Sequence, residues 1–346
     1  MALAISIVWT ANAPTDDPYS MQNTQWNGMS ALTRTGFLAV TTDLMDTLQS
    51  ANATQVLLVV EPSHPFARQE ATSIGDFVSR GSLLVIADNF GTSNGLLGLL
   101  GLPVKFDNKL LIDPLFYRKQ PSFPVISYFS ESEFSIGLDE LVLDRATTLN
   151  ITATDKVKVL ATSSAFSFLD LNQDGEKSAQ EPSGPFPILA EVQLGEGKIL
   201  LFTSPASLAN GLIDQGSNSA LVERIVAYGS GPEHHSLLLY DETHLRRSPF
   251  TPTKLMAQQL VRSILDGGMQ LSAKLELSAL CAVLLAARYV CGKPKAAKKV
   301  EPLQAVSSPG IETALRLHPT WDHEKLEYVA HELDASMKWR RLSEGE

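Results

Sequence analysis

The chain of 346 residues carries 28 Lys and Arg against 38 Asp and Glu, which gives a formal net charge of −10. Its 44% hydrophobic and 19% charged residues are typical of a globular protein and exclude a disordered one. The acidic excess argues against a nucleic-acid partner, because nucleic-acid binding needs a basic face. The two cysteines, Cys281 and Cys291, are too few for a disulfide scaffold or a cysteine-based zinc site, and no thiol nucleophile precedes them.

An apolar run opens the chain over residues 2–9 and is followed by Ala11-Asn12-Ala13, which has the small–x–small spacing of a cleavage site. A secretory signal also needs a basic segment before the apolar one, and these first residues carry no Lys or Arg. We therefore expect a buried strand here, with a weak or truncated export signal as the alternative.

Predicted strands and helices alternate from residue 29 to about residue 265. The strands are expected at 55–60, 82–87, 157–162, 188–193, 198–203 and 236–240, and the helices at 66–79, 94–100, 218–228 and 253–265. Strands that are apolar on both faces and joined by helices indicate a mostly parallel sheet covered on both sides. Gly195-Glu196-Gly197 predicts a hairpin between two of these strands. Residues 102–156 are less regular and are interpreted as an insertion in one α/β domain, residues 1–268.

A dense apolar segment follows at residues 269–292. A membrane-spanning helix needs about 20 predominantly apolar residues, whereas the uncharged core here covers only 277–287. Four lysines between 293 and 299 fit the positive-inside pattern. Two interpretations stay open: an anchor that leaves residues 1–268 outside the cytoplasm, or a docking helix of a soluble cytoplasmic protein. Residues 293–346 are expected to form a linker and a short helical tail.

Residues 170–181 match the calcium-loop pattern D-x-[DN]-x-[DN]-G-x5-E at every fixed position. Calcium takes six to eight oxygen ligands, and a glycine at the sixth position permits the sharp turn that aims them inward. The expected ligands are the side chains of Asp170, Asn172, Asp174 and Glu181, the backbone carbonyl of Glu176, and the hydroxyl of Ser178 or a water in its place.

The surroundings of this loop are not those of an EF-hand. A strand-like segment precedes it, and Pro182, Pro185 and Pro187 prevent an exiting helix. A lone loop of this kind binds calcium in the extracellular range of about 10⁻⁴–10⁻³ M, which suits a structural site outside the cell. A polar surface turn without calcium is the alternative.

Another polar cluster, Tyr240-Asp241-Glu242-Thr243-His244, follows the last apolar strand. Open α/β sheets bind ligands at the carboxyl ends of their strands, where Glu61, Asp88-Asn89 and Thr203-Ser204 also stand. The predicted ligand-binding residues are Asp88, Asn89, Ser204, Asp241, Glu242 and His244. One alternative is that these carboxylates cap helices and order loops. The other is that Asp241, Glu242 and His244 form a metal site or a general acid–base group.

Motifs for nucleophilic or nucleotide chemistry are missing from the sequence. It contains no G-x-S-x-G, H-E-x-x-H, G-x-G-x-x-G or phosphate-loop lysine motif. After the strand at 82–87, where an amidotransferase would carry its cysteine nucleophile, the chain has Asp88 and Asn89. A catalytic nucleophile is therefore not expected there.

Several short marks, taken in order, resemble a largely archaeal and bacterial family of membrane-anchored proteins. Its outer domain is similar to class I glutamine amidotransferases and is of the GldG type. The marks are Tyr19-Ser20-x-x-Asn23, Gly28-x-Ser30, Pro62, residues 81–88, Leu97-x-x-Leu100-Gly101-Leu102, Gly184-Pro-x-Pro187, Gly195-x-Gly197, Asn210, Asn218 and Asp241-Glu242-Thr243-His244.

This resemblance implies a flavodoxin-like three-layer sandwich for the outer domain, an anchor at 269–291 and no established activity. The amidotransferase relatives use a Cys-His-Glu triad, and residues 1–268 of this chain contain no cysteine. The resemblance therefore implies a non-catalytic, pseudoenzyme-like module.

We expect a binding or scaffolding module on the outer face of a membrane, with calcium in the loop at 170–181 as its cofactor. Its partner would be a membrane, a membrane-protein assembly such as an export or surface-remodelling system, or an unidentified small ligand or protein. The competing expectation is a metal-dependent hydrolase that uses Asp241, Glu242 and His244.

Overall fold

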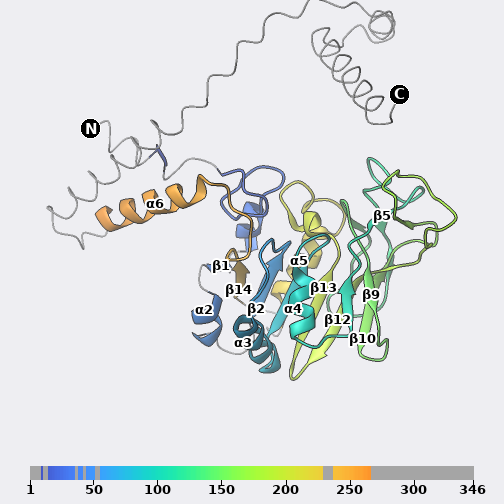
Figure 1. Cartoon of the computed structure of the whole chain (residues 1–346), viewed down its shortest axis with the longest axis horizontal. Helices are drawn as coiled ribbons and strands as arrows, with labels where there is room; N and C mark the ends of the chain where they lie inside the picture. Colours follow the sequence, from blue (N-terminus) through green and yellow to red (C-terminus); the bar gives the residue numbers. More distant parts are fainter. Residues whose placement is uncertain are drawn as a thin grey trace, which may run out of the picture. The chain divides into compact units, whose positions relative to one another are not determined.

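The computed structural model describes residues 9–10, 15–35, 38–41, 44–50, 55–228 and 237–265 (Figure 1). The chain divides into two compact units, Met1–Met269 and Gln270–Glu346, and the second lies outside the described residues. The predicted apolar segment 269–292 and the tail lie outside as well, as does the strand expected at 2–9 except for Trp9, which is helical. None of the helices in the described ranges is long and apolar enough to cross a membrane.

An eight-stranded sheet organises the described part of the chain, in the order β1-β14-β2-β3-β13-β12-β10-β7. Its strands are β1 (Leu38–Thr41), β2 (Val56–Val60), β3 (Leu83–Ala87), β7 (Tyr128–Phe129), β10 (Val157–Thr162), β12 (Pro187–Leu194), β13 (Gly197–Phe202) and β14 (Leu238–Asp241). The pairings from β1 to β13 are parallel, and those from β13 to β7 are antiparallel. The fold is therefore mixed α/β, with a parallel half that continues into an antiparallel half through the expected hairpin between β12 and β13.

Helices cover both faces of this sheet. They are η1 (Ser30–Thr35), α2 (Leu44–Ser50), α3 (Arg68–Ser79), α4 (Ser93–Leu99), η2 (Pro205–Leu208) and α5 (Asn218–Val226). A further helix, α6 (Thr251–Leu265), follows β14 in the chain. In β2, Leu58 and Val60 pack in the core that contains η1 and α5, whereas Leu57 and Val59 pack in the core that contains α2, α3 and α4. Burial on both faces is the reason that the parallel strands are continuous apolar runs.

Helix α3 shows how the sequence fixes these layers. The carboxylate of Glu70 accepts a hydrogen bond from the backbone N–H of Ala67 at 2.6 Å and so satisfies a donor that the first turn leaves free. Ile74, Phe77 and Val78, which share one helical face in the sequence, are all buried. Through this face, α3 packs in the core on one side of the sheet.

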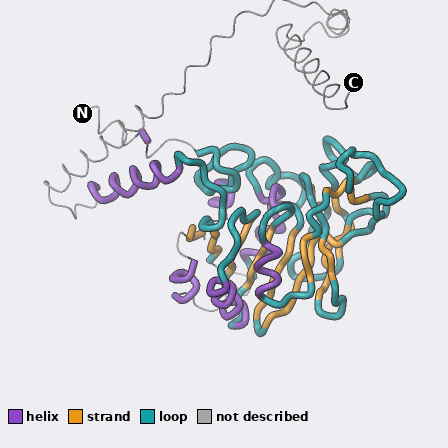
Figure 2. Tube along the Cα trace, viewed as in Figure 1, coloured by secondary structure: helices purple, strands orange, loops and turns teal. Residues whose placement is uncertain are grey.

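The segment predicted to be an insertion, residues 102–156, forms short strands that pair outside the main sheet, apart from β7. Here β4 (Val104–Phe106) pairs with β9 (Leu149–Ile151), β6 (Val125–Ile126) with β8 (Leu141–Val142), and β5 (Leu110–Ile112) with β11 (Phe168–Asp170). Figure 2 shows that loops form much of this part of the chain. Because β5 and β11 are antiparallel partners, the loop after β5 lies beside the loop before β11.

Candidate functional site

Polar residues gather where four neighbouring parallel strands end. We call the carboxyl ends of these strands the strand-end edge. Strands β14, β2, β3 and β13 finish at one edge of the sheet, and the residues at their ends are Asp241, Glu61, Asp88 and Thr203-Ser204. Helix α4, which follows β3, covers one face of the sheet, and α5, the next α-helix after β13, covers the other. Neighbouring parallel strands whose following helices lie on opposite faces mark the place where open α/β sheets bind ligands.

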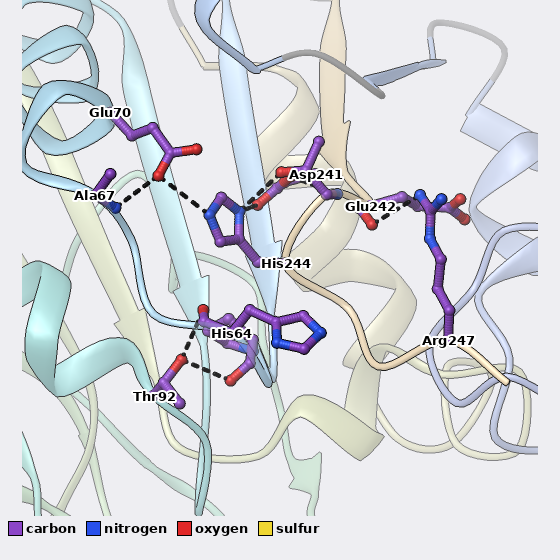
Figure 3. A network of polar contacts seen from close by, with 10 residues as sticks. His64, Ala67, Glu70, Thr92, Asp241, Glu242, His244 and Arg247 are labelled. Atoms are coloured by element: carbon purple, nitrogen blue, oxygen red, sulfur yellow. Dashed lines mark hydrogen bonds and ion pairs between the residues drawn. The ribbon is translucent and has the colours of Figure 1, made fainter. Parts of the chain in front are cut away.

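His244 lies between two carboxylates at this edge (Figure 3). Its Nδ1 is 2.7 Å from Oδ2 of Asp241, and its Nε2 is 3.4 Å from Oε2 of Glu70. The imidazole ring also stacks on the ring of Phe66, with the two centroids 3.7 Å apart. The Asp241 side chain is fully buried, and that of His244 is nearly so. The imidazole therefore joins the end of β14 to the first turn of α3.

The charge state of His244 follows from these neighbours. Burial alone lowers the pKa of the imidazole, but the hydrogen bond and charge of Asp241, together with the charge of Glu70, outweigh it and raise that pKa. The raised pKa extends protonation of the imidazole to higher pH, and each of its ring nitrogens lies close to a carboxylate oxygen.

Glu242 is turned to a different partner. Its Oε1 accepts hydrogen bonds from the hydroxyl of Ser20 at 3.1 Å and from the backbone N–H of Met21 at 2.7 Å. Its own carbonyl oxygen accepts a hydrogen bond from Arg247 at 3.0 Å, as Figure 3 shows. Glu242 therefore fastens an N-terminal segment to the end of β14 and does not join the pair formed by its sequence neighbours.

Asp88 organises the loop between β3 and α4. Its Oδ1 accepts the backbone N–H of Asn89 and of Gly91, each at 2.7 Å, and its Oδ2 accepts that of Ser93 at 3.0 Å. A Cβ at Gly91 would lie 2.6 Å from Oδ1, so only glycine fits this close approach. Burial raises the pKa of Asp88, and these hydrogen bonds oppose that rise. The side chain is used as an internal acceptor.

Asn89 and Ser204 connect the same edge to the insertion. The amide nitrogen of Asn89 donates to the carbonyl of Arg145 at 3.0 Å. The hydroxyl of Ser204, which is fully buried, accepts the backbone N–H of Asp144 at 3.2 Å and donates to the carbonyl of that residue at 3.3 Å. Both predicted ligand-binding residues therefore hold the segment at 144–145 against the sheet.

The structure adds partners that sequence reasoning did not identify at this edge. The Tyr19 hydroxyl hydrogen-bonds to the carboxylate of Glu61, a residue with a positive φ of 39°. Burial raises the pKa of Glu61, and nearby Asp88 raises it further. Burial also raises the pKa of Asp144, whose Oδ1 is buried without a hydrogen-bond partner among the described residues. Tyr19 and Asp144 lie far from the strand ends in sequence, so no local pattern signals them.

The predicted calcium loop closes on itself through its first and last carboxylates. Oδ1 and Oδ2 of Asp170 accept the backbone N–H groups of Gln173 at 2.6 Å and Gly175 at 3.0 Å. Oε1 and Oε2 of Glu181 accept those of Leu171 and Ser178, each at 2.8 Å. The backbone hydrogen bonds from Ser178 and Leu171 lower the pKa of Glu181.

The middle of this loop is also hydrogen-bonded internally. Asp174 accepts the amide of Asn172 at 2.7 Å and the backbone N–H of Glu176 at 2.7 Å, and Gly175 has the positive φ (75°) that the sharp turn requires. Within the described ranges, no three His, Cys, Asp or Glu side chains form a group that could hold a metal ion. The loop has the turn that the pattern predicts, and its carboxylates face the protein backbone.

Comparison with known proteins gives a family and a set of distant structural neighbours. The mmIFT52 N-terminal domain matches with 15% identity and a TM-score of 0.48, over 64% of this chain and 97% of that domain. Cytoplasmic proteins STM1381 and STM3548 of Salmonella typhimurium match with 14% identity each and TM-scores of 0.36 and 0.35, over 57% and 58% of this chain and 84% of each of theirs. None of the curated proteins matches the chain. A family model described as "Domain of unknown function (DUF4350)" matches residues 21–226, which is more than half of the chain. The chain therefore belongs to the DUF4350 family.

Proposed function

We propose that the chain is a non-catalytic binding or scaffolding module, related to the GldG-type, glutamine-amidotransferase-like domains and held at the outer face of a membrane. The observation that carries this proposal is the use of the strand-end carboxylates as internal acceptors. Asp88, Asp241 and Glu242 are each buried, and each accepts at least two hydrogen bonds from the protein itself. A catalytic acid or base must instead reach a proton of the substrate.

The layering supports the finer, flavodoxin-like description of the fold. Helices lie on both faces of a sheet that is parallel at its centre. Numbered in chain order, however, the five parallel strands run 1-5-2-3-4, whereas flavodoxin-like sheets run 2-1-3-4-5. We therefore limit the proposed likeness to the layers and do not extend it to the connectivity.

The proposal that this edge is non-catalytic is tested by the stability of an Asp88→Asn variant. Both oxygens of Asp88 accept N–H groups, so an amide must turn its NH₂ group toward one donor. We expect a loss of about 1–3 kcal/mol, or several degrees in Tm, and no change in Asp155→Asn, an exposed aspartate that serves as the control. Equal stability of the Asp88→Asn variant and the unaltered chain would show that this carboxylate does not support the loop and would overturn the proposal.

The membrane location is supported by the apolar segment 269–292 and the lysines that follow it. The test is the distribution of the full chain between membrane and soluble fractions without detergent. Recovery in the membrane fraction, lost when polar residues replace 277–287, is the result we expect. Recovery of the unaltered chain as a monodisperse soluble protein would instead favour a cytoplasmic domain with a docking helix.

The loop at 170–181 is proposed as a weak structural calcium site. The match of residues 170–181 to the calcium-loop pattern supports it, and so does the positive φ of Gly175, which gives the turn that the pattern requires. Calorimetric titration of the full chain with CaCl₂ is expected to give a Kd of about 10⁻⁴–10⁻³ M, absent in Asp174→Ala and unchanged in Asp155→Ala. No heat with the unaltered chain would reduce the loop to a surface turn.

The competing hydrolase has less support. Of its three expected groups, Asp241 and His244 contact each other, but Glu242 is turned away from both and contacts Ser20 and Met21. A metal-dependent hydrolytic activity that disappears in His244→Gln, with folding intact, would nevertheless favour it over the binding module.

A further inference from the structure

Exposed apolar side chains gather on two neighbouring loops, the one after β5 and the one before β11. Leu115, Phe116 and Tyr117 are 60%, 43% and 41% exposed, and Phe166 is 59% exposed. The rings of Phe116 and Phe166 are 6.3 Å apart. We call these four residues the aromatic patch. Large apolar side chains that cluster on a surface mark a site of interaction, whereas single ones need no explanation.

The aromatic patch is held outward by a buried carboxylate. Oδ1 of Asp113, a fully buried residue, accepts the backbone N–H groups of Leu115 at 3.0 Å and Phe116 at 2.9 Å. Its Oδ2 accepts the hydroxyl of Ser164 at 2.6 Å, which ties the loop that carries Phe166 to the same point. Because both loops are already ordered, binding would not cost the conformational entropy of ordering them.

Two basic residues border the aromatic patch. Arg118 and Lys119 follow Tyr117 directly, and residues 114–120 are all exposed. Arg118 pairs with Glu140, and Lys119 interacts with Asp144. The Arg118 side chain is still 49% exposed, so exposed apolar side chains and exposed cations lie next to each other.

We propose that the aromatic patch, together with Arg118 and Lys119, docks this domain onto an anionic lipid surface. Leucine and aromatic side chains enter the boundary between headgroups and acyl chains, tyrosine is favoured at that depth, and Lys and Arg attract anionic headgroups. The exposed run 114–120 places apolar and cationic side chains next to each other, which is the combination that binds at the surface of an anionic bilayer. The inference rests on the proposed membrane location and adds the surface that meets the lipid.

The test uses the full chain with Phe116→Trp and phosphatidylcholine vesicles with or without phosphatidylglycerol, some of them brominated in the acyl chains. Difference spectra against the unaltered chain remove the signal of its own 4 tryptophans. We expect the added emission to shift to shorter wavelength and to be quenched by brominated anionic vesicles. Ile136→Trp is the matched control, because Ile136 is an exposed apolar residue (54%) outside the aromatic patch.

Two further substitutions in the Phe116→Trp chain measure the apolar and cationic contributions. Lys119→Gln is expected to raise the lipid concentration for half-maximal quenching about fivefold, and Leu115→Ser about tenfold. No quenching at residue 116, equal quenching by vesicles without phosphatidylglycerol, or a shift that appears with protein concentration alone would each overturn the proposal. The last of these would indicate self-association.

These outcomes are separate from the fate of the proposed binding module. An anchor at 269–292 would bring the chain to any bilayer without placing residue 116 among the acyl chains. Conversely, the Asp88→Asn experiment reports on the strand-end edge and is independent of lipid.

Discussion

The strand-end edge and the aromatic patch use their side chains in opposite ways. At the edge, carboxylates that could meet a substrate are buried and satisfied by the protein, as Asp88 and Glu242 are. On the insertion, Leu115 and Phe116, which could fill a core, are held in solvent by the backbone contacts of Asp113. A carboxylate or an aromatic ring therefore indicates function only once its contacts in the folded chain are known.

The largest loss of stability is expected from a substitution of Glu242 at the strand-end edge. Glu242→Ala removes the acceptor of the Ser20 hydroxyl and the Met21 N–H and leaves both donors at a buried position. We expect the free energy of unfolding, measured with urea, to fall by about 3 kcal/mol. Glu196→Ala, in the exposed β12–β13 turn, is the control and should leave it unchanged. If both variants behaved alike, Glu242 would not be a structural tie.

A somewhat smaller change in stability is expected when two nearby glycines, Gly91 and Gly95, are each replaced by alanine. A Cβ at Gly91 would meet Asp88 and the carbonyl of Pro62 at 2.6 and 2.8 Å, whereas a Cβ at Gly95 would meet nothing within 4 Å. Gly91→Ala is therefore expected to cost about 2 kcal/mol, and Gly95→Ala to stabilise α4 by about 0.5–1 kcal/mol. Thermal unfolding of the two variants measures the difference, and equal Tm values would contradict the role given to the Asp88 loop.

The pH dependence of the free energy of unfolding tests whether His244 is protonated more readily in the folded chain. Its pKa in the folded chain is raised above the ordinary 6.5, so the folded state binds more protons than the unfolded state above that pH. The resulting stabilisation is complete below pH 6.5 and is lost as the pH rises through the raised pKa. Unfolding free energies between pH 6 and 9 are expected to fall more steeply for the unaltered chain than for His244→Gln. Parallel curves would show that the imidazole carries no such charge.

The smallest effect is expected on the aromatic patch, where the two regions differ most. Leu115→Ser and Tyr117→Ser remove side chains that are mostly in solvent, so the free energy of unfolding should change by no more than about 0.5 kcal/mol. Leu84→Ala, at a fully buried position of β3, serves as the contrast and should cost about 2–5 kcal/mol. A large loss at Leu115 would show that this residue supports the fold and would remove the ground for a docking surface.

Much of the central sheet could be predicted because its strands are buried on both faces. The apolar runs at 55–60 and 82–87 became β2 and β3 almost to the residue. Strand β1, by contrast, was not expected at Leu38–Thr41, since four residues at a sheet edge give little pattern. The short strands of the insertion also escaped prediction, because their pairing, as of β5 with β11, joins residues far apart in sequence.

The sequence indicated where the candidate site lies, but not what its side chains contact. Strand ends pointed to Asp88, Asp241 and His244, yet the partners that decide their role come from other segments, such as Glu70 in α3. The aromatic patch gave no sequence signal at all. A Leu-Phe-Tyr run has the composition of a core segment, and the contacts of Asp113 that hold it at the surface are made through the backbone, which leaves no mark in the sequence.

The central claim, that the strand-end edge is an internal support, is tested most directly by a double-mutant cycle between Asp241 and His244. The free energies of unfolding of Asp241→Asn, His244→Gln and the double variant would be compared with that of the unaltered chain. Since the Nδ1–Oδ2 distance is 2.7 Å, we predict that each single variant is destabilised and that the coupling is about 1–3 kcal/mol. A coupling near zero, or a single variant more stable than the unaltered chain, would contradict the account.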